Sequence, residues 1–362
     1  MNKKYFKALL LSVIVAGTTC AQVLQSEDFN SLTIGNVGTD IDFSTAGQGG
    51  FFTLADNVDA GATTPTTTTN AANSNFQIIT GGLARTQGLR IVGPNGDQGA
   101  RQITKGDFST AFTNRTVGND IVEVEIYFNT GTFAISETFS RILMFGDDAG
   151  TSRIPVGLQF NQTTGELSGL ANLLQAGAVG FFGFNLGAAN TDLILPPSTW
   201  VHVGMAYDTT NGALRWAYDA GNMIDGQLTF TNAANVIPGM APNEVDLLLF
   251  TGATNTIATS VPFDNLEVRA TATNQLLNAP SQEAVLDVAI YPNPATDFVT
   301  LRSDTIDLAA YTITDLSGKL LVKQAVNGTT ERIDISNLSS GIYLLQIESV
   351  GGGLVTKKVI KQ

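Results

Sequence analysis

Cysteine and histidine are almost absent from this 362-residue sequence, which has one of each, Cys20 and His202. Without further cysteines, disulfides cannot hold the fold, and no Cys/His spacing suited to a zinc site is present. A lone histidine without a nearby Ser or Cys pattern does not indicate a catalytic triad. We therefore interpret His202 as a strand residue and assign no catalytic residue.

Positive charge is also scarce. The chain has 19 Lys and Arg residues against 32 Asp and Glu residues, which gives a net charge of −13. Nucleic acid is not an expected partner, because phosphate binding requires a basic face that displaces counterions. We interpret the acidity as keeping a secreted protein soluble and monomeric. An affinity for divalent cations is the alternative.

Long apolar runs are limited to the N-terminus. Residues 1–7 are basic and residues 8–17 are apolar, which is the layout of a secretory signal peptide. The apolar run is too short to span a bilayer of about 30 Å. Small residues up to Ala21 predict removal of residues 1–21, so we expect no transmembrane helix in the mature chain. The alternative is a lipoprotein acylated on Cys20.

The rest of the chain has the composition of an all-β protein. Only 14% of the residues are charged, and short alternating apolar segments recur between clusters of Gly, Asn and Asp. This pattern predicts strands at residues 121–128, 154–160, 200–207, 213–218 and 245–250. Glycine and asparagine at 161–165 and 208–212 predict hairpin loops. The polar stretch 271–286 predicts an interdomain linker.

Four short blocks follow the predicted linker in a fixed order. They are Tyr291-Pro292-Asn293-Pro294, a turn around Gly318, a strand that contains Gly341 and Tyr343, and the basic residues Lys357 and Lys358. The ordered set resembles the type A sorting domain of the Bacteroidetes type IX secretion system over residues 287–362. From residue types alone, the same stretch predicts a small immunoglobulin-like β-sandwich, because prolines interrupt one strand and glycines turn the chain into others.

The resemblance implies a route and a destination. We expect the chain to cross the inner membrane by the Sec route and the outer membrane through the type IX machinery, its expected partner. The destination is then the cell surface or the medium, and the module is expected to be cut off upstream. The alternative is an accessory immunoglobulin-like domain without a role in export.

Residues 22–270 form the passenger that this module would export. They open with an acidic segment that leads into Phe29, close with an apolar strand around 264–265, and carry Trp200 and His202 in a strand before a hairpin. These motifs resemble those of the concanavalin A-like and laminin-G-like jelly rolls. The resemblance implies an all-β jelly-roll sandwich whose first and last strands pair.

Exposed aromatic rings are the candidates for ligand binding. Phe181, Phe182 and Phe184 stand among glycines, which predicts a loop that presents them to solvent. Trp216 could stack on a sugar ring, although an aromatic residue in an alternating strand is more often part of the core. The predicted function is a secreted or cell-surface binding or adhesion protein for a glycan or matrix polymer.

Glu123 and Glu125 lie two residues apart on one predicted strand and so share a face. Some enzymes of this fold use carboxylates spaced along one strand for acid and nucleophile work. A third carboxylate is absent here, because residues 126–128 are Ile, Tyr and Phe. We interpret the pair as the solvated side of an amphipathic strand. A divergent polysaccharide hydrolase or lyase, and a structural surface component, are the alternative functions.

A metal site is predicted where the two ends of the passenger meet. The period of two slips by one residue at Asp264 and Asn265, which predicts a β-bulge. Pairing of the first and last strands would bring Asp264 near Glu27 and Asp28, where several oxygen ligands would suit a structural calcium ion. The alternative is that Asp264 and Asn265 cap the bulge through hydrogen bonds to backbone amides.

Overall fold

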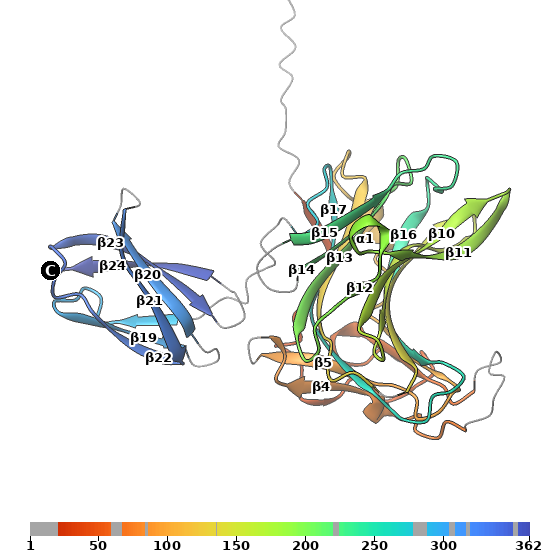
Figure 1. The fold of residues 1–362 in the computed structure, drawn as a ribbon, viewed down its shortest axis with the longest axis horizontal. Coiled ribbons are helices and arrows are strands. Elements are labelled where there is room, and N and C mark those ends of the chain that lie inside the picture. The colour runs from red at the N-terminus through yellow and green to blue at the C-terminus, as the bar shows by residue number, and fades with distance from the viewer. Residues whose placement is uncertain are drawn as a thin grey trace, which may run out of the picture.

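The computed structural model describes the chain in nine stretches. They are residues 21–58, 67–83, 86–134, 136–219, 224–277, 288–303, 308–315, 319–349 and 354–362. The predicted signal peptide, apart from Ala21, and the predicted turn at Gly318 lie outside these residues. Within them the chain forms two antiparallel β-sandwiches, which we call the first and second sandwich (Figure 1).

The first sandwich consists of two sheets. Sheet A has the order β15 (Ile224–Phe230), β14 (Leu214–Asp219), β13 (Trp200–Asp208), β7 (Ile121–Asn129), β17 (Ser260–Thr271), β5 (Gln87–Val92), β4 (Phe76–Thr80) and β2 (Gly35–Asn36), and β1 (Gln22–Glu27) pairs with β17. Sheet B has the order β11 (Ala178–Asn185), β10 (Glu166–Gln175), β9 (Thr151–Asn161), β8 (Thr138–Asp148), β16 (Ala241–Thr251), β6 (Ala100–Thr104) and β3 (Phe52–Ala55), and β12 (Leu193–Ile194) pairs with β10.

In the described residues, helical structure is limited to short segments. They are α1 (Ser109–Thr113) and the 3-10 turns η1 (Gln48–Gly50), η2 (Asn73–Asn75) and η4 (Ala188–Asn190). In the stretches that the structure describes, no helix has the length and apolar character needed to cross a membrane. The expected all-β class is therefore confirmed for both sandwiches.

The core of the first sandwich lies between its two sheets. In β7, Val122, Val124, Ile126 and Phe128 are buried at alternate positions, because successive side chains of a strand point to opposite faces. The ring of Phe128 in sheet A lies 5.1 Å from the ring of Phe160 in sheet B, between ring centroids. The residues between these positions therefore point to the outer faces of the sheets.

The predicted strands of the passenger are β7, β9, β13, β14 and β16, and each covers all or all but one of the expected residues. The predicted hairpin loops are also present, between β9 and β10 and between β13 and β14. Gly165 and Gly212 end these loops with φ angles of 78° and 76°. Glycine is needed there because this left-handed region penalises residues with a Cβ atom.

The first and last strands of the first sandwich pair, as expected of a jelly roll. Strand β1 runs antiparallel to β17, with Glu27 opposite Leu266. Strand β17 carries the expected bulge, because its register against β7 shifts between Asp264 and Glu267 and Asn265 has a φ of 49°. The slip in the sequence pattern therefore marked a real irregularity of the ladder.

The second sandwich is smaller. Sheet C has the order β18 (Val288–Tyr291), β19 (Phe298–Ser303) and β22 (Thr330–Asp334), and sheet D has the order β21 (Leu320–Gly328), β20 (Leu308–Asp315), β23 (Gly341–Ser349) and β24 (Leu354–Lys361). Strand β23 lies inside its sheet, which agrees with the apolar pattern that begins at Gly341. Its core includes Leu301, Ile313, Leu345 and Ile347.

Asn293 joins the beginning of the second sandwich to its last strand. Its side-chain nitrogen donates to the carbonyl oxygen of Lys358 at 2.7 Å, and its side-chain oxygen accepts from the Ile360 N–H at 2.9 Å. The hydroxyl of Tyr343 donates to the carbonyl oxygen of Ser339 at 2.8 Å. The first and the last of the sequence blocks noted above therefore contact each other.

A short segment continues beyond β17 and lies on the outer face of sheet A. We call residues 272–277 the strap. Leu276 and Leu277 are buried in it and pack against Ala206 of β13 and Ala217 of β14. The two leucines of the strap therefore pack on small side chains at the middle of the sheet.

Gly204 of β13 makes room for the strap. A Cβ atom on Gly204 would stand 2.6 Å from Cδ1 of Leu276, which is closer than real contacts allow. The strap belongs to the first sandwich, although residues 271–286 were expected to be a linker. Residues 278–286 of that predicted linker lie outside the described residues.

The strap leads to a first prediction. Leu276→Ala should lower the free energy of unfolding of the first sandwich by about 2 to 5 kcal/mol, because a buried leucine leaves a cavity when it is truncated. Urea unfolding followed by tryptophan fluorescence measures this sandwich alone, since both tryptophans, Trp200 and Trp216, belong to it. Leu174→Ala, at a side chain that is 37% exposed, is the matched control. Equal losses in the two variants would show that the strap is not packed as described.

Candidate functional site

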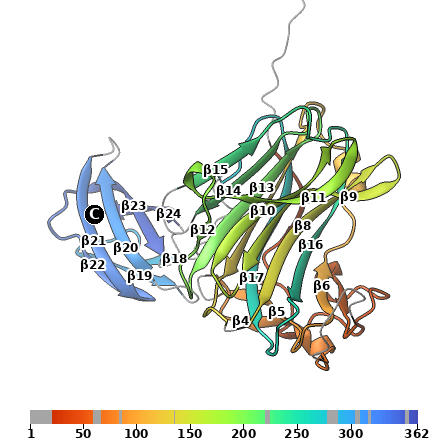
Figure 2. The same ribbon diagram turned by 45° about the vertical axis from the view of Figure 1, so that its right-hand side comes forward.

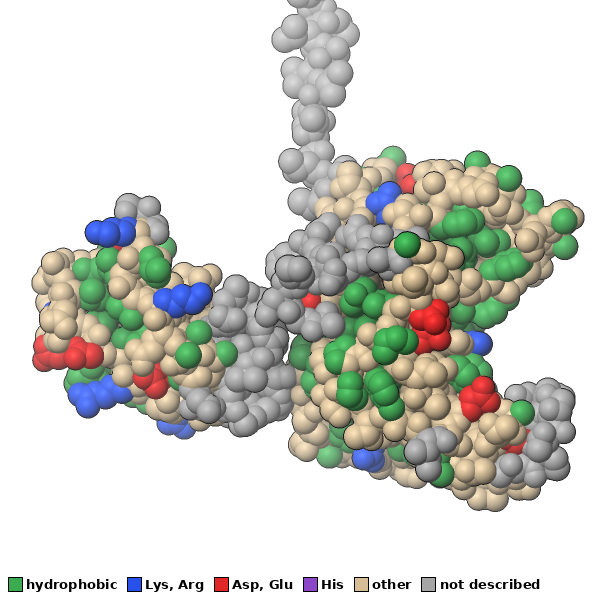
Figure 3. Space-filling view, viewed as in Figure 1, with side chains coloured by type: hydrophobic (Ala, Val, Ile, Leu, Met, Phe, Trp, Pro, Cys, Tyr) green, Lys and Arg blue, Asp and Glu red, His purple; other side chains and the backbone are tan. Residues whose placement is uncertain are grey.

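The outer face of sheet B is hollow. In the paired strands β8 and β16, Phe139 stands opposite Phe250 and Arg141 opposite Leu248, and these side chains alternate with core residues. Figure 2 shows β10, β9, β8 and β16 side by side across the sheet. The space-filling view in Figure 3 shows a hollow in the first sandwich, between the β10–β11 hairpin and the lobe formed by the N-terminal strands.

The curvature of sheet B also follows from one contact. Strands β11 and β8 are separated by β10 and β9, so a flat sheet would hold them about 14 Å apart. The guanidinium carbon of Arg141 in β8 nevertheless lies 5.6 Å from the ring centroid of Phe181 in β11. The hairpin therefore curls over the face, and its outward side chains lean toward the centre of the hollow.

Arg141 lies at the centre of an aromatic cluster. Its guanidinium carbon is 4.2 Å from the ring centroid of Phe250, which stacks on Phe139 with 5.0 Å between ring centroids. Its Nε donates to Oε1 of Gln159 at 2.8 Å. We call Phe139, Arg141, Gln159, Phe181 and Phe250 the Arg141 cluster. Burial lowers the pKa of Arg141 to about 10, so the side chain stays a cation at neutral pH.

A carboxyl pair lies on the same face of β16. Asp246 is only 1% exposed and accepts a hydrogen bond from the side-chain amide of Gln102. Burial raises the pKa of Asp246 to about 8, and the negative charge of Glu244 acts in the same direction. Asp246 therefore holds a proton at neutral pH, as a general acid must.

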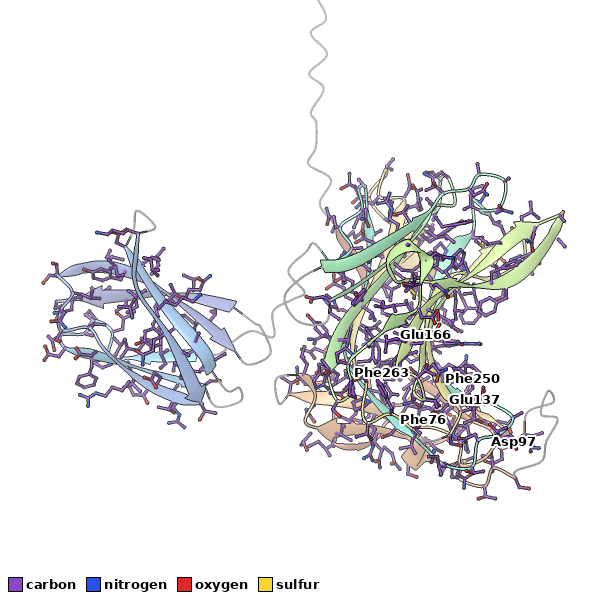
Figure 4. All side chains as sticks on the ribbon, viewed as in Figure 1. Phe76, Asp97, Glu137, Glu166, Phe250 and Phe263 are labelled. Atoms are coloured by element: carbon purple, nitrogen blue, oxygen red, sulfur yellow. The ribbon has the colours of Figure 1, made fainter. Side chains whose placement is uncertain are left out.

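Two more carboxylates stand around the hollow. Figure 4 labels Glu137 and Glu166 there, together with Phe250. Glu137 is exposed, and Oε1 of Glu166 accepts a hydrogen bond from the Ser168 hydroxyl at 3.0 Å. The face thus combines aromatic rings, one cation and several hydrogen-bonding groups. That is the composition of a site for a polar ligand with apolar faces.

The sequence analysis missed Arg141 and Asp246. Each is a charged residue at an alternate position of an otherwise apolar strand, so its pattern equals that of an ordinary solvent-facing residue. The available signal was the density of aromatic residues beside them, with Phe139 two positions before Arg141 and Phe250 four positions after Asp246. A cluster of exposed aromatic residues indicates a candidate binding face, whereas an ordinary solvent-exposed face has few of them.

Of the aromatic residues expected to bind ligand, only Phe181 faces the hollow, and it is 42% exposed. Phe182 and Phe184 pack against the core, and the Phe184 ring lies 4.7 Å from the Trp216 ring. Trp216 is 1% exposed and donates from Nε1 to the carbonyl oxygen of Gly157 at 2.7 Å. Phe182 and Phe184 are not presented to solvent as expected, because the glycine-rich segment is strand β11 and not a loop. Trp216 is a core residue, which is the more common role of an aromatic residue in an alternating strand.

The carboxylate pair on β7 is buried, so its interpretation as a solvated face was wrong. Arg269 of β17 donates from Nε to Glu123 at 2.7 Å and from Nη2 to Glu125. Nε2 of His202 lies 3.1 Å from Glu125, and its ring stacks on Tyr127 with 4.2 Å between centroids. His202 is a strand residue, as expected, but its partner is a buried charge.

The strap explains why Glu123 and Glu125 on the outer face of sheet A are shielded from solvent. The Gln275 N–H donates to Glu123 at 2.6 Å, and the Leu277 N–H donates to Glu125 at 2.8 Å. Burial raises the pKa of Glu123. Burial acts the same way on Glu125, but contacts with His202 and Arg269 outweigh it and lower its pKa. This ion cluster binds the chain's own strap and offers no open face to a ligand.

Asp264 holds the turn between β4 and β5. Its Oδ2 accepts from the Leu83 N–H at 2.8 Å and from the Thr86 hydroxyl at 3.0 Å, and its Oδ1 accepts from the Asn265 N–H at 2.8 Å. Burial raises the pKa of Asp264 to about 7, and the charge of Asp28 adds to that effect. These donors are those of a capped bulge.

The other predicted calcium ligands have partners of their own. Glu27 pairs with Lys105 and accepts from the Phe29 N–H at 2.9 Å, while Asp28 accepts from the Asn30 N–H at 3.0 Å. Among the residues that the structure describes, no group of three or more His, Cys, Asp or Glu side chains is placed to hold a metal ion. Structural calcium stays a prediction.

Comparison with known families concerns the second sandwich. Residues 289–362 match the family described as the secretion system C-terminal sorting domain. These residues form a type IX sorting domain. The protein is therefore directed by the type IX secretion system to the cell surface or the extracellular space, and the type IX machinery is its partner.

Two curated proteins are similar to part of the chain. An endo-acting ulvan lyase of Formosa agariphila is 33% identical over 75 residues, which are 20% of this chain and 14% of that protein. Beta-agarase D of Zobellia galactanivorans is 30% identical over 82 residues, which are 22% of this chain and 16% of that protein. The chain thus spans less than a fifth of the length of either relative.

Among solved structures, a glycoside hydrolase family 16 endo-glucanase from Bacteroides ovatus is similar, with a TM-score of 0.42 and 11% sequence identity. That likeness covers 68% of this chain and 100% of the glucanase. The legume lectin-like domain from Entamoeba histolytica has a TM-score of 0.32 and 10% identity over 54% of this chain and 84% of its own.

The raised pKa of Asp246 predicts a pH dependence of stability. The folded state keeps the proton up to about pH 8, whereas the unfolded chain releases it near its ordinary value of 3.8. Raising the pH between these values therefore favours unfolding, and the effect from pH 5 to 8 is on the order of 4 kcal/mol. Asp246→Asn should lose less stability than the parent protein over this range, as urea unfolding at several pH values will measure. Asp192→Asn, at an exposed residue, is the control, and identical slopes in all three proteins would contradict the assignment.

Asp264 gives a second prediction about stability. Asp264→Ala leaves the Leu83 N–H without its acceptor and should cost about 1 to 3 kcal/mol. If Asp264 acts as a cap alone, the loss of melting temperature is equal in millimolar calcium and in excess chelator, which is the result we expect. If the predicted calcium ion binds, calcium raises the melting temperature of the parent protein and Asp264→Ala abolishes the rise.

Proposed function

We propose that this protein is a secreted polysaccharide-binding protein that holds its ligand in the hollow outer face of sheet B. The observation that carries the proposal is the Arg141 cluster, in which rings from β8, β11 and β16 meet at the centre of a concave face. Sugar rings have apolar faces that pack on aromatic side chains and hydroxyl edges that need hydrogen-bond partners. The hollow supplies both.

The position of the cluster supports a polymer as the ligand. The outer face of sheet B is crossed by neighbouring strands from β11 to β3, so it offers contacts along a line and not at a single point. Export by the type IX system places this face outside the cell, where polysaccharides are available. The two curated relatives of part of this chain are named as an ulvan lyase and an agarase, which supports a carbohydrate ligand.

A polysaccharide hydrolase or lyase is the second candidate, and one observation favours it. Asp246 is protonated at neutral pH and lies with Glu244 on the face that would hold the glycan. A carboxyl that is protonated at neutral pH is in the form that a general acid of glycosidic cleavage needs. Release of reducing ends or of unsaturated products from a bound polysaccharide, lost in Asp246→Asn, would establish this activity.

Phe181 provides the test of binding. Phe181→Ala should weaken polysaccharide binding about 3- to 10-fold, because one stacking ring contributes roughly 0.5 to 1.5 kcal/mol. Affinity electrophoresis of residues 22–362, with the sorting domain kept, in gels containing a panel of polysaccharides measures the change. The same panel, read for product release, separates a binder from an enzyme.

The sorting domain offers a matched control for this variant. Phe298 is also a partly exposed phenylalanine with a guanidinium, that of Arg332, 3.9 Å from its ring centroid. Phe298→Ala should leave polysaccharide binding unchanged. If Phe298→Ala and Phe181→Ala migrate alike in every gel, the hollow of sheet B is not the binding face.

A further inference from the structure

Arg141 has donor groups that the protein does not use. Its Nε donates to Gln159, while among the described residues neither terminal nitrogen donates a hydrogen bond and no carboxylate lies within ion-pair distance. These nitrogens also do not belong to the buried unpartnered atoms, so they are open to solvent in the hollow. The result is a planar pair of N–H donors held at the bottom of a binding face.

Two other buried arginines show what a purely structural guanidinium looks like here. Arg101 donates to the carbonyl oxygen of Ala100 at 2.9 Å and to side-chain oxygens of Asn57 and Asn70. Arg269 is paired with three glutamates. Arg269 is satisfied by the protein itself, and Arg101 is satisfied except at its buried Nε. Arg141 is less buried than either, lacks the acceptors of Arg101 at its terminal nitrogens, and has none of the carboxylates of Arg269.

The aromatic rings fix where the free donors point. Phe250 and Phe181 both approach the guanidinium, at 4.2 Å and 5.6 Å from ring centroid to guanidinium carbon, and the bond to Gln159 restrains Nε. The side chain therefore cannot turn away to solvent without losing these contacts. The rings and Gln159 thus occupy two sides of the guanidinium. The edge that carries the two terminal nitrogens has no partner among the described residues.

We propose that Arg141 recognises an anionic substituent of the polysaccharide, a carboxylate or a sulfate ester, through its two terminal nitrogens. This inference rests on the proposed function and specifies its ligand class. A guanidinium matches two oxygens of a carboxylate or sulfate with two parallel hydrogen bonds, which gives both strength and orientation. The rings of Phe181 and Phe250 would then hold the sugar that carries the anion.

The most deeply buried acidic group of the same face, Asp246, does not oppose this role. Asp246 is neutral below about pH 8, so it does not repel an anion at neutral pH. Arg141 itself has a pKa lowered by burial alone, with no carboxylate contributing to its environment. The charge of Arg141 is therefore not offset by an ion pair, although Glu137 and Glu166 stand around the hollow and the whole chain has a net charge of −13.

The test compares three polymers on residues 22–362, with the sorting domain kept: alginate, which carries carboxylates, carrageenan, which carries sulfate esters, and laminarin, which is neutral. The parent protein should bind at least one anionic polymer more tightly than laminarin. Arg141→Gln should weaken that binding about tenfold to hundredfold, because a charge-assisted hydrogen-bond pair is lost. It should weaken laminarin binding by a smaller factor, because only the packing of Arg141 against Phe181 and Phe250 is changed there. The preferred polymer, carboxylated or sulfated, identifies the substituent.

Two further variants separate recognition from packing. Arg141→Lys keeps the charge but not the planar pair of donors, so its affinity for the anionic polymer should lie between those of the parent and Arg141→Gln. Arg332→Gln removes a guanidinium that also lies over a phenylalanine ring, in the sorting domain, and should have no effect. Tryptophan fluorescence in urea confirms that the first sandwich of each variant is folded, and far-UV circular dichroism does so for the sorting domain of Arg332→Gln.

The outcomes distinguish this inference from the proposed function. If the parent binds laminarin as tightly as the anionic polymers and Arg141→Gln binds all three unchanged, polysaccharide binding stands and the anion site is overturned. If the folded parent protein binds none of the three polymers, both proposals are overturned. Selective loss of the anionic polymer in Arg141→Gln supports both.

Discussion

The buried guanidinium of Arg269 is the interaction on which sheet A and its covering depend. Moving a charge out of water costs several kcal/mol, and this cost is met only when the charge is closely paired. Glu123 and Glu125 provide the pairing from the neighbouring strand, so the register of β7 against β17 becomes a condition for burying all three. The strap closes the arrangement from above, because its amide groups supply donors to the same two carboxylates.

The two outer faces of the first sandwich each carry a partly or fully buried arginine, and the two arginines differ in their partners. On sheet A the charge of Arg269 is fully paired and covered, and the outcome is rigidity. On sheet B the charge of Arg141 is partly buried by rings but keeps free donors toward a hollow. A side chain of one type thus distinguishes the structural face from the candidate functional one, and the difference lies in the partners and not in the residue.

The sequence predicted the features of the fold that are local. The period of two located β7, β13 and β16, and a one-residue slip located the bulge at Asp264, because both depend only on neighbours in the chain. The interior position of Phe182 and Phe184 was missed because glycines hid the strand period of β11. The burial of Glu123 could not be read at all, since the strap residue that covers it lies 152 positions further along the chain.

The candidate site was less accessible to sequence analysis than the fold. Phe181 was found by its glycine-rich surroundings, but Arg141 and Asp246 became candidates only when curvature brought β11 over β8. A charged residue on an amphipathic strand gives the same alternation in the sequence whether its face is flat and solvent-exposed or concave and partly buried. Curvature of a sheet arises from the sum of many strand contacts, so a motif search along the chain does not contain it.

The position of the strap also determines how the first sandwich responds to mechanical tension. The described part of this sandwich ends at Leu277, on the middle of the outer face of sheet A and not at the end of β17. A pull from the C-terminal side acts first on the two leucines and the two amide hydrogen bonds of the strap, which peel from the sheet in turn. The ladder between β17 and β1 is loaded only afterwards. Tension is therefore relieved by releasing a short segment before the jelly roll itself begins to open.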